Sequence, residues 1–465
     1  MKKGVWRLRV PKIDRLLGIE FYATETAGIG GVIRKSVEDF LVEEVLVDGS
    51  KAKINRASER RVLGASTYKQ RYLLCVLTKR NWDTFIALRS IAKQLNLSQG
   101  QIQIAGIKDA KAVTAQHITV EKCSIEDAFK VNVNDIEIRP VGYVHEKLSP
   151  YYLLGNHFTI RIKAIKHSES TVAKRVAETA QALDSAGGIP NFFGHQRFGT
   201  TRPITHLVGK ALVEGDFKEA AMLFLAKPSF HEHQSSRNAR TELRSTRNFK
   251  QALQNFPRQL RYETLMLRHL VEKPDDFVGA LKRLPFKLQT LFVQAYQSYL
   301  FNRFLSERIK SGFSLNKAEV GDFVVNVERS GLSMVNVTKV AGAETVAEAN
   351  ELVKAGRMRV ALPLIGIKQK PSQGVMGQIE QHILEEEGIK PENFKVNEIS
   401  ESSGRGGLRA VLTPVQGFKL DDISIVVSDQ SYSQADLSFM LMRGSYATVL
   451  LREIMKSENP IKAGF

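Results

Sequence analysis

The sequence predicts an α/β protein of two domains. Its 465 residues exceed the roughly 250–300 residues at which a single hydrophobic core stops growing. Up to about residue 165, short runs that alternate polar and apolar residues, typical of half-buried strands, stand on either side of an amphipathic helical segment. After about residue 200 the composition shifts toward helix, with abundant Lys, Arg and Gln. These observations indicate a strand-rich part followed by a helix-rich one.

The first elements are a strand and a basic loop. Residues 31–44 predict a turn and a strand, with Phe40 and Val42 on one face and Arg34 at the entry. Residues 48–71 are polar and predict an exposed loop, whose cations are Lys51, Lys53, Arg56, Arg60, Arg61, Lys69 and Arg71. A solvated surface and a contact with phosphate explain such a loop equally well. Residues 1–26 indicate no function.

The next elements lead to one acidic loop. Residues 72–78 predict a buried strand, residues 81–97 an amphipathic helix, and residues 101–105 and 116–120 two half-buried strands. The loop between the last two strands presents Asp109 at a strand end, flanked by Lys108 and Lys111, whose positive charges favour the ionised carboxylate. Such a carboxylate can act as a base, a metal ligand or a nucleophile. Alternatively, it hydrogen-bonds only its own turn.

A β-rich region and a helix precede a short aromatic motif. Residues 136–140, 143–145 and 158–163 predict strands, and residues 168–186 predict a helix that ends at a Gly-Gly-Ile-Pro stop. The motif Asn191-Phe-Phe-Gly-His-Gln-Arg-Phe-Gly199 follows. Its rings can stack on an extruded base while Asn and Gln side chains read the base edge. On its own, the motif favours the alternative of an aromatic turn that closes a core.

The second half predicts helices, short strands and one cationic stripe. Helices are expected at residues 257–271, 285–309 and 346–355, a strand at 423–427, and a strand, turn and helix over 439–454. Arg237, Arg240, Arg244 and Arg247 recur every three or four residues, a spacing that places them on one face of a helix. On so basic a chain, the stripe favours phosphate binding over a solvated surface.

Composition narrows the function classes. Lys and Arg total 67 against 49 Asp and Glu, a formal net charge of +18, which predicts a polyanionic partner. No apolar run approaches the roughly 20 residues of a membrane span, and the N-terminal sequence has no signal-peptide apolar core, so we expect a cytoplasmic protein. Two cysteines are too few for a disulfide framework or a cysteine-rich metal site. His231 and His233 lack a third ligand, so no metal is expected.

Several motifs together resemble the TruD family of tRNA pseudouridine synthases. They lie, in order, at residues 31–44, 106–116, 154–158, 191–199, 292–302 and 439–454. The resemblance implies a discontinuous catalytic domain with a mixed β-sheet, residues 1–215 and 413–465. An inserted α/β domain, residues 216–412, would face it across a basic cleft in a V-shaped molecule. Residues 1–26 and the 48–71 loop have no clear counterpart in the motifs.

The resemblance also implies a reaction, the isomerisation of a uridine in tRNA, at position thirteen, to pseudouridine without a cofactor. It assigns Asp109 as the nucleophile, or as the base in a variant mechanism, and Arg34 as its ion-pair partner. Asn191 and Phe193 would hold the flipped nucleotide. Further candidate RNA contacts are Lys108, Lys111, Arg197 and the arginine stripe. We expect a monomer with no obligate protein partner.

Two other functions fit parts of the sequence. A non-catalytic RNA-binding or RNA-folding protein would explain the charge, but it has no need of a carboxylate that faces a polyanion. A metal-dependent nuclease would need a cluster of carboxylates. Asp109 has no acidic neighbour within its motif.

Overall fold

The computed structural model describes residues 9–55, 62–399, 402–427 and 431–465. Within them the largest element is a mixed eight-stranded sheet with the order β13-β14-β6-β1-β4-β2-β5, in which β3 pairs with β4. Strands β1 and β4 run parallel, and the other neighbouring pairs are antiparallel. The strands are β1 (Phe40–Leu46), β2 (Tyr72–Arg80), β3 (Ile102–Ile104), β4 (Val113–Glu121), β5 (Ile136–Val144), β6 (Leu153–Ile165), β13 (Gln416–Val427) and β14 (Ser431–Met442). The predicted α/β class with a mixed sheet is confirmed.

The sheet brings the two ends of the chain together. Val42 in β1 lies opposite Thr114 of β4 on one side and Phe158 of β6 on the other. Phe439 of β14 pairs with Phe158 in turn. The last strands of the sequence are therefore built into the same sheet as the first, as expected for a discontinuous core.

Helices pack around this sheet and begin at polar caps. They are α1 (Lys12–Leu16), α2 (Thr84–Gln94), α3 (Ile125–Phe129), α4 (Glu169–Ser185) and α14 (Ala447–Met455). Helix α2 begins three residues later than predicted, because Asn81 has a positive φ of 55° and the Asp83 side chain accepts hydrogen bonds from the first free backbone N–H groups. Helix α4 matches its prediction, with Ser168 as its cap.

The helix-rich part follows residue 200. Its helices are α5 (Thr205–Glu214), α6 (Phe217–Ala226), α7 (Gln234–Thr246), α8 (Phe249–Asn255), α9 (Arg261–Glu272), α10 (Phe277–Lys282) and α11 (Phe286–Lys310). A smaller antiparallel sheet, in the order β11-β10-β8-β9, comes next. Its elements are β8 (Phe323–Val327), β9 (Ser333–Val340), α12 (Val346–Lys354), β10 (Met358–Leu364), α13 (Gly374–Glu386) and β11 (Gly407–Ala410). The short strands β7 (Ile189–Pro190) and β12 (Leu412–Thr413) pair where the chain returns to the large sheet.

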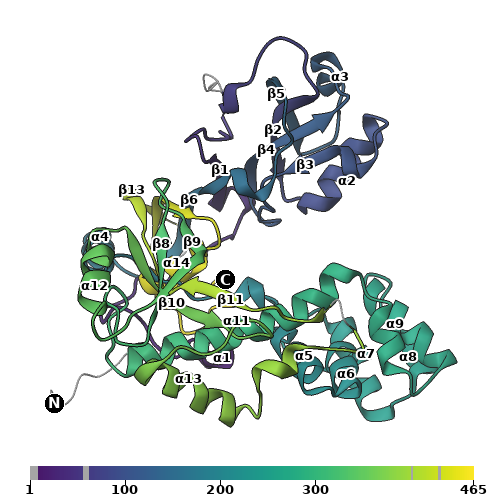
Figure 1. Ribbon diagram of the computed structural model, residues 1–465. Coiled ribbons are helices and arrows are strands. Elements are labelled where there is room, and N and C mark those ends of the chain that lie inside the picture. Colours follow the sequence, from purple (N-terminus) through teal and green to yellow (C-terminus); the bar gives the residue numbers. More distant parts are fainter. Residues whose placement is uncertain (1–8, 56–61, 400–401, 428–430) are drawn as a thin grey trace.

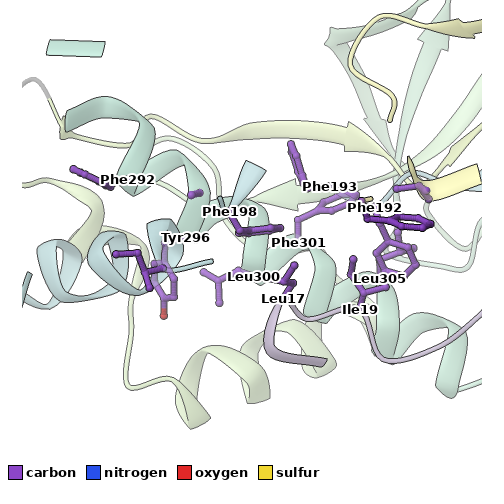
Figure 2. Packing of buried hydrophobic residues seen from close by; sticks show 14 of the residues in the cluster. Leu17, Ile19, Phe192, Phe193, Phe198, Phe292, Tyr296, Leu300, Phe301 and Leu305 are labelled. Atoms are coloured by element: carbon purple, nitrogen blue, oxygen red, sulfur yellow. The ribbon is translucent and has the colours of Figure 1, made fainter. Parts of the chain in front are cut away.

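Helix α11 is the axis of the main hydrophobic core. Its side chains Phe292, Tyr296, Leu300, Phe301 and Leu305 lie in a row of buried contacts (Figure 2). Leu17 and Ile19, from the N-terminal segment, pack into the same core and are fully buried. Part of residues 1–26 therefore has a structural role that the sequence did not indicate.

Figure 1 shows two arms that diverge from a common centre, the V outline expected for this fold. Strands β2 to β5 with α2 and α3 form the upper arm, and helices α5 to α9 form the lower right arm. The expected boundary between residues 215 and 216 falls at Gly215, which ends α5 with a φ of 79°. Helix α5 packs against both α6 and α11, and one buried cluster runs across the boundary. The division at residues 215 and 412 stays a prediction.

Part of the predicted 48–71 loop, with Arg56, Arg60 and Arg61, lies outside the described residues. In the part that is described, Lys51 pairs with Glu43 at 2.6 Å and Arg71 with Glu121 at 3.1 Å. No helix within the described residues combines the length and the apolar character that a membrane crossing requires.

Candidate active site

Polar side chains of the sheet and of α2 hold the loop that carries Asp109 in place. It joins β3 to β4, and its backbone carbonyls accept hydrogen bonds from the sheet and from α2. Lys79 Nζ donates to the Asp109 carbonyl at 2.7 Å, Gln116 Nε2 donates to the Gly106 carbonyl at 3.0 Å, and Thr84 Oγ1 binds the backbone of Lys108. Burial lowers the pKa of Lys79 to about 8, against the opposing charge of Asp109. These bonds fix the position of Asp109 at the strand end.

Asp109 forms an ion pair with Arg34. Arg34 Nη2 donates to Asp109 Oδ1 at 2.8 Å, and the Arg34 side chain is 7% exposed against 33% for Asp109. The guanidinium lies 3.9 Å from the centroid of the Phe40 ring and also donates to the Gly464 carbonyl. Arg34 has a φ of 56°, an uncommon conformation for a residue other than glycine. Burial lowers the pKa of Arg34, and Asp109 opposes this shift.

The two lysines beside Asp109 do not share one role. Lys111 is exposed, but Lys108 is 5% exposed and its Nζ lies 2.7 Å from Glu44 Oε2. Glu44 Oε1 also accepts from the backbone N–H of His117 at 2.9 Å. Burial alone would raise the pKa of Glu44, but Lys108 and His117 bring it below its usual value. Lys108, a candidate RNA contact, is therefore drawn inward by a buried carboxylate on β1, and its contact with RNA stays a prediction.

A cavity of about 270 Å³ opens at Asp109. Its floor and walls come from β1, β6, the Asp109 loop and the turn between β14 and α14. Besides Asp109 and Arg34, the residues in its lining that bear on recognition are Phe40, Asn156, Phe158, Gln196, Arg443 and Tyr446. A planar group that entered this cavity would meet aromatic rings and an anionic oxygen.

Asn191 and Phe193 lie next to this cavity, but neither lines it among the described residues. Asn191 Nδ2 donates to the Ala410 carbonyl at 2.9 Å, and its Oδ1 accepts from Arg409 Nη2 at 2.6 Å. Phe193 is 8% exposed and packs edge-on against Phe301, on α11 (Figure 2). The Arg409 guanidinium lies 4.0 Å from the Phe193 ring centroid. Both side chains are held by the strand that returns from the second half of the chain.

Sequence reasoning missed Tyr446 and gave Gln196 no individual role. Tyr446 lines the cavity, and its ring centroid is 6.1 Å from that of Phe193. Gln196 also lines the cavity, and its Oε1 accepts from Thr448 Oγ1 at 3.1 Å. Both residues stand inside quoted motifs, residues 191–199 and 439–454. An aromatic residue in a Gly-Ser-Tyr turn was the available signal for Tyr446.

The arginine stripe is only partly on the surface. Arg240 is 2% exposed, and it binds Glu232 Oε2 at 3.0 Å and Glu263 Oε1 at 2.6 Å. Arg247 ends α7 with a φ of 54° and so leaves the helical face. Arg244 and Arg247 are exposed, and Arg237 is half-buried. The prediction of one stripe of four arginines is therefore wrong. Two carboxylates outside α7 hold the Arg240 side chain in the interior.

Arg197 is tied to α11. Its Nε donates to Ser298 Oγ at 3.1 Å and its Nη2 to Gln294 Oε1 at 3.2 Å. Burial lowers the pKa of Arg197. Among the described residues, no group of three or more His, Cys, Asp or Glu side chains is arranged to hold a metal ion.

Comparisons with known proteins show the family of the chain. The family model described as tRNA pseudouridine synthase D (TruD) matches residues 16–454. A relative from Methanosarcina acetivorans, named "Probable tRNA pseudouridine synthase D", is 39% identical over 97% of this chain and 98% of its own. One of the same name from Pyrococcus furiosus is 35% identical over 94% of this chain and 98% of its own. A crystal structure described as tRNA pseudouridine synthase D (TruD) from Methanosarcina mazei, 37% identical, matches with a TM-score of 0.80 over 98% of this chain and all of its own. The chain therefore belongs to the tRNA pseudouridine synthase D (TruD) family and is an enzyme of the pseudouridine synthase class.

Proposed function

We propose that this enzyme converts a uridine of folded tRNA to pseudouridine, with Asp109 as the nucleophile. The observation that carries the proposal is the Arg34–Asp109 ion pair at a cavity with aromatic walls. The reaction breaks the glycosidic bond, rotates the uracil and joins its C5 to C1′, so that no atom is gained or lost. Family resemblance favours uridine 13, and a tRNA substrate favours a cytoplasmic location.

The cavity supports this chemistry in three ways. Arg34 fixes one carboxylate oxygen, which leaves the other free to face the nucleotide, since Asp109 Oδ2 has no hydrogen-bond partner within the described residues. Tyr446, which is half-buried, supplies a ring for a base that has left the helical stack, and the buried rings of Phe40 and Phe158 make the surrounding wall apolar. Flipping a base costs a few kcal/mol, and stacking in the cavity together with phosphate contacts would offset it.

Asn191 and Phe193 enter the proposal as supports. Phe193 packs against Tyr446, and Asn191 is held by Arg409, whose Nη2 also donates to the Gly444 carbonyl at 2.8 Å. Gly444 belongs to the turn that forms one wall of the cavity. The two residues would therefore hold the nucleotide through that wall.

The proposal is tested by Asp109→Asn, assayed for pseudouridine in an unmodified tRNA transcript with EDTA present. Single-turnover activity should be lost while tRNA affinity stays within a few-fold, because the carboxylate reacts and the basic surface binds. Asp275→Asn, an exposed aspartate on the lower arm, is the matched control and should keep full activity. Measurable turnover in Asp109→Asn would reject the nucleophile. Absence of activity in the unmodified protein would favour the non-catalytic RNA-binding alternative.

A further inference from the structure

Two cavities adjoin at the end of α6 and share Lys227. We call the larger one, about 510 Å³, the aromatic cavity, because His206, Phe230, Tyr296 and Tyr299 are in its lining. The smaller one, about 240 Å³, is the cationic cavity, lined by Lys227, Arg244, Arg247 and Glu219 together with apolar side chains of α6. Helices α5, α6 and α7 belong to the lower arm, whereas β3 and β4, which flank Asp109, belong to the upper one (Figure 1). The pair of cavities is therefore separate from the active site.

The aromatic cavity combines flat rings with charged residues, which are Arg15, Arg202, Lys210, Lys227 and Glu387. The His206 and Tyr299 rings are stacked, with centroids 5.3 Å apart and an interplanar angle of 24°. Burial lowers the pKa of His206 to about 4, so its imidazole is neutral at pH 7. Phe230 is 87% exposed, an unusual position for a large apolar ring. A volume of this size accommodates a heterocyclic base and its sugar.

The carboxylate in the aromatic cavity already has partners. Glu387 accepts hydrogen bonds from the Tyr296 and Tyr299 hydroxyls at 3.2 and 3.1 Å and from Lys210 Nζ at 2.7 Å. Its charge is thus compensated within the wall. An incoming anion would meet little repulsion from it.

The cationic cavity holds three positive charges against one carboxylate, Glu219. Within the described part of the chain, Lys227, Arg244 and Arg247 form no ion pair with a carboxylate. Burial lowers the pKa of Lys227; Glu219 opposes this, and the charge of Arg244 adds to it. Unpaired guanidinium and ammonium groups around a polar hollow are the usual ligands of a phosphate.

The half-buried Arg202 and the buried Arg240 fix the backbone that carries Lys227. Arg202 Nη1 donates to the carbonyls of Phe224 and Lys227, and Arg240 Nη1 donates to those of Phe224 and Leu225. The free carbonyls at the end of α6 are therefore satisfied by side chains. Arg240, expected to contact RNA, instead stabilises the junction between the two cavities.

We propose that the two cavities form one binding site for a nucleotide, with the base against Tyr299 and Phe230, next to the buried His206, and the phosphate between Lys227, Arg244 and Arg247. Each half alone would take a different ligand, an apolar ring or an inorganic anion. Their junction at Lys227 matches the way a nucleotide joins a base to a phosphate. The occupant is either a free nucleoside monophosphate or one unpaired nucleotide of the RNA substrate, and the second source rests on the proposed function.

The first experiment measures binding of AMP, adenosine and inorganic phosphate to the full chain by calorimetry. The variants are Phe230→Ala, Lys227→Met and the control Arg268→Ala, an exposed arginine on α9 that lines neither cavity. Phe230→Ala should weaken the binding of AMP at least tenfold but leave the binding of phosphate unchanged. Lys227→Met should weaken both ligands. Arg268→Ala should change neither. Since Phe230 is exposed, its truncation should leave the melting temperature unchanged.

The second experiment measures the affinity of the same variants for unmodified tRNA, and the single-turnover rate at saturating tRNA. If Phe230→Ala and Lys227→Met weaken tRNA binding at least fivefold with the rate unchanged, the occupant is a nucleotide of the RNA, even where free AMP binds too weakly to measure. If only AMP binding falls, the occupant is a free nucleotide. If the variants bind both AMP and tRNA as tightly as Arg268→Ala does, the proposal is overturned. If the protein without substitutions forms no pseudouridine in tRNA, the proposed function is rejected instead.

Discussion

Around the proposed nucleophile, three cationic side chains hold backbone carbonyls and neighbouring polar side chains in place. Lys79 binds the Asp109 carbonyl, Lys108 binds Glu44, and Arg409 binds both Asn191 and the turn at Gly444. Burial lowers the pKa of Arg409 to about 10, and the nearby charge of Arg197 lowers it further while Tyr446 opposes this. Charged side chains are costly to bury unless each finds a partner. Their positions here are consistent with a site whose geometry is fixed before substrate arrives.

Phe193 offers a test at this scale. Phe193→Ala removes a ring that is 8% exposed and contacts Phe301 and Tyr446. The expected loss of unfolding free energy is about 3–5 kcal/mol, the usual result of truncating a buried Phe. Urea denaturation measures it. Phe129→Ala, which truncates a ring that is 68% exposed, should change stability by less than about 0.5 kcal/mol. A stability loss equally small for Phe193→Ala would return Phe193 to the role of a direct base contact.

At the scale of elements, buried polar pairs join neighbouring segments. Glu44 of β1 and Lys108 of the Asp109 loop pair at 2.7 Å with side chains that are 0% and 2% exposed. Arg308 of α11 holds Asp322, ahead of β8, through two bonds of 2.9 and 2.8 Å. These contacts align strand and loop, or helix and sheet, more closely than apolar packing alone would.

Separating the Glu44–Lys108 pair should disturb both stability and the active loop. Lys108→Met leaves Glu44 buried without its cation, and we expect a loss of about 3–5 kcal/mol. The double variant Glu44→Leu/Lys108→Met should recover part of this loss, because no unpaired charge remains. Denaturation of Lys108→Met, Glu44→Leu and the double variant completes a double-mutant cycle, which measures the coupling between the two side chains. Strict additivity of the two changes would show that the pair is not coupled.

Helix α13 carries a carboxyl group whose protonation should make stability depend on pH. Glu380 accepts hydrogen bonds from the backbone N–H and hydroxyl of Ser372, and burial raises its pKa to about 8, with Asp322 adding and Arg308 opposing. The folded state therefore holds a proton between about pH 4.5 and 8 that the unfolded state has released. By linkage, stability from this group is present at low pH and falls as pH rises through that window, by at most about 1.4 kcal/mol per pH unit.

Glu380→Gln should remove this dependence, since an amide does not titrate and can keep both contacts with Ser372. The difference in unfolding free energy between variant and parent should favour the variant increasingly from pH 5 to pH 8. Glu385→Gln, an exposed site on the same helix, is the control and should show no such trend. A flat difference for Glu380→Gln would mean that the carboxyl group is already ionised at pH 5.

At the scale of the whole molecule, the net charge of +18 is not spread over equivalent residues. Some cations, such as Arg240 and Arg308, are buried and paired, while Arg244 and Arg247 are exposed. Only accessible cations release counterions from RNA on binding. The sum of charge therefore overstates the number of phosphate contacts.

Paired substitutions on α7 separate these two groups. Arg244→Ala/Arg247→Ala should weaken tRNA binding and reduce the slope of log affinity against log salt by about two units. Arg240→Ala should leave that slope unchanged and instead destabilise the fold by about 3–5 kcal/mol, because Glu232 and Glu263 lose their buried partner. Salt titrations of tRNA binding measure the slope for both variants, and melting curves measure their stability. A reduced slope for Arg240→Ala alone would place that residue on the RNA surface.

The sequence by itself determined the elements and the chemistry available to them. Residue periodicity located β2, α2, α4 and α11 within a few residues, because the alternation of polar and apolar side chains follows the local backbone repeat. The motif at residues 106–116 placed Asp109 at a strand end for the same reason. Composition established the basic character of the molecule.

Only the tertiary structure decided which polar residues face the cavity and which are buried. Arg240 and Arg244 look alike in sequence, but Glu232 and Glu263 bind the first from outside α7. Asn191 is held by Arg409, 218 residues away. The turn at Tyr446 reaches Asp109 because β14 pairs with β6, which pairs with β1. Spacing along one element fixes the face on which a residue lies, but its burial and partner depend on what packs against that face, and here those partners come from distant parts of the chain.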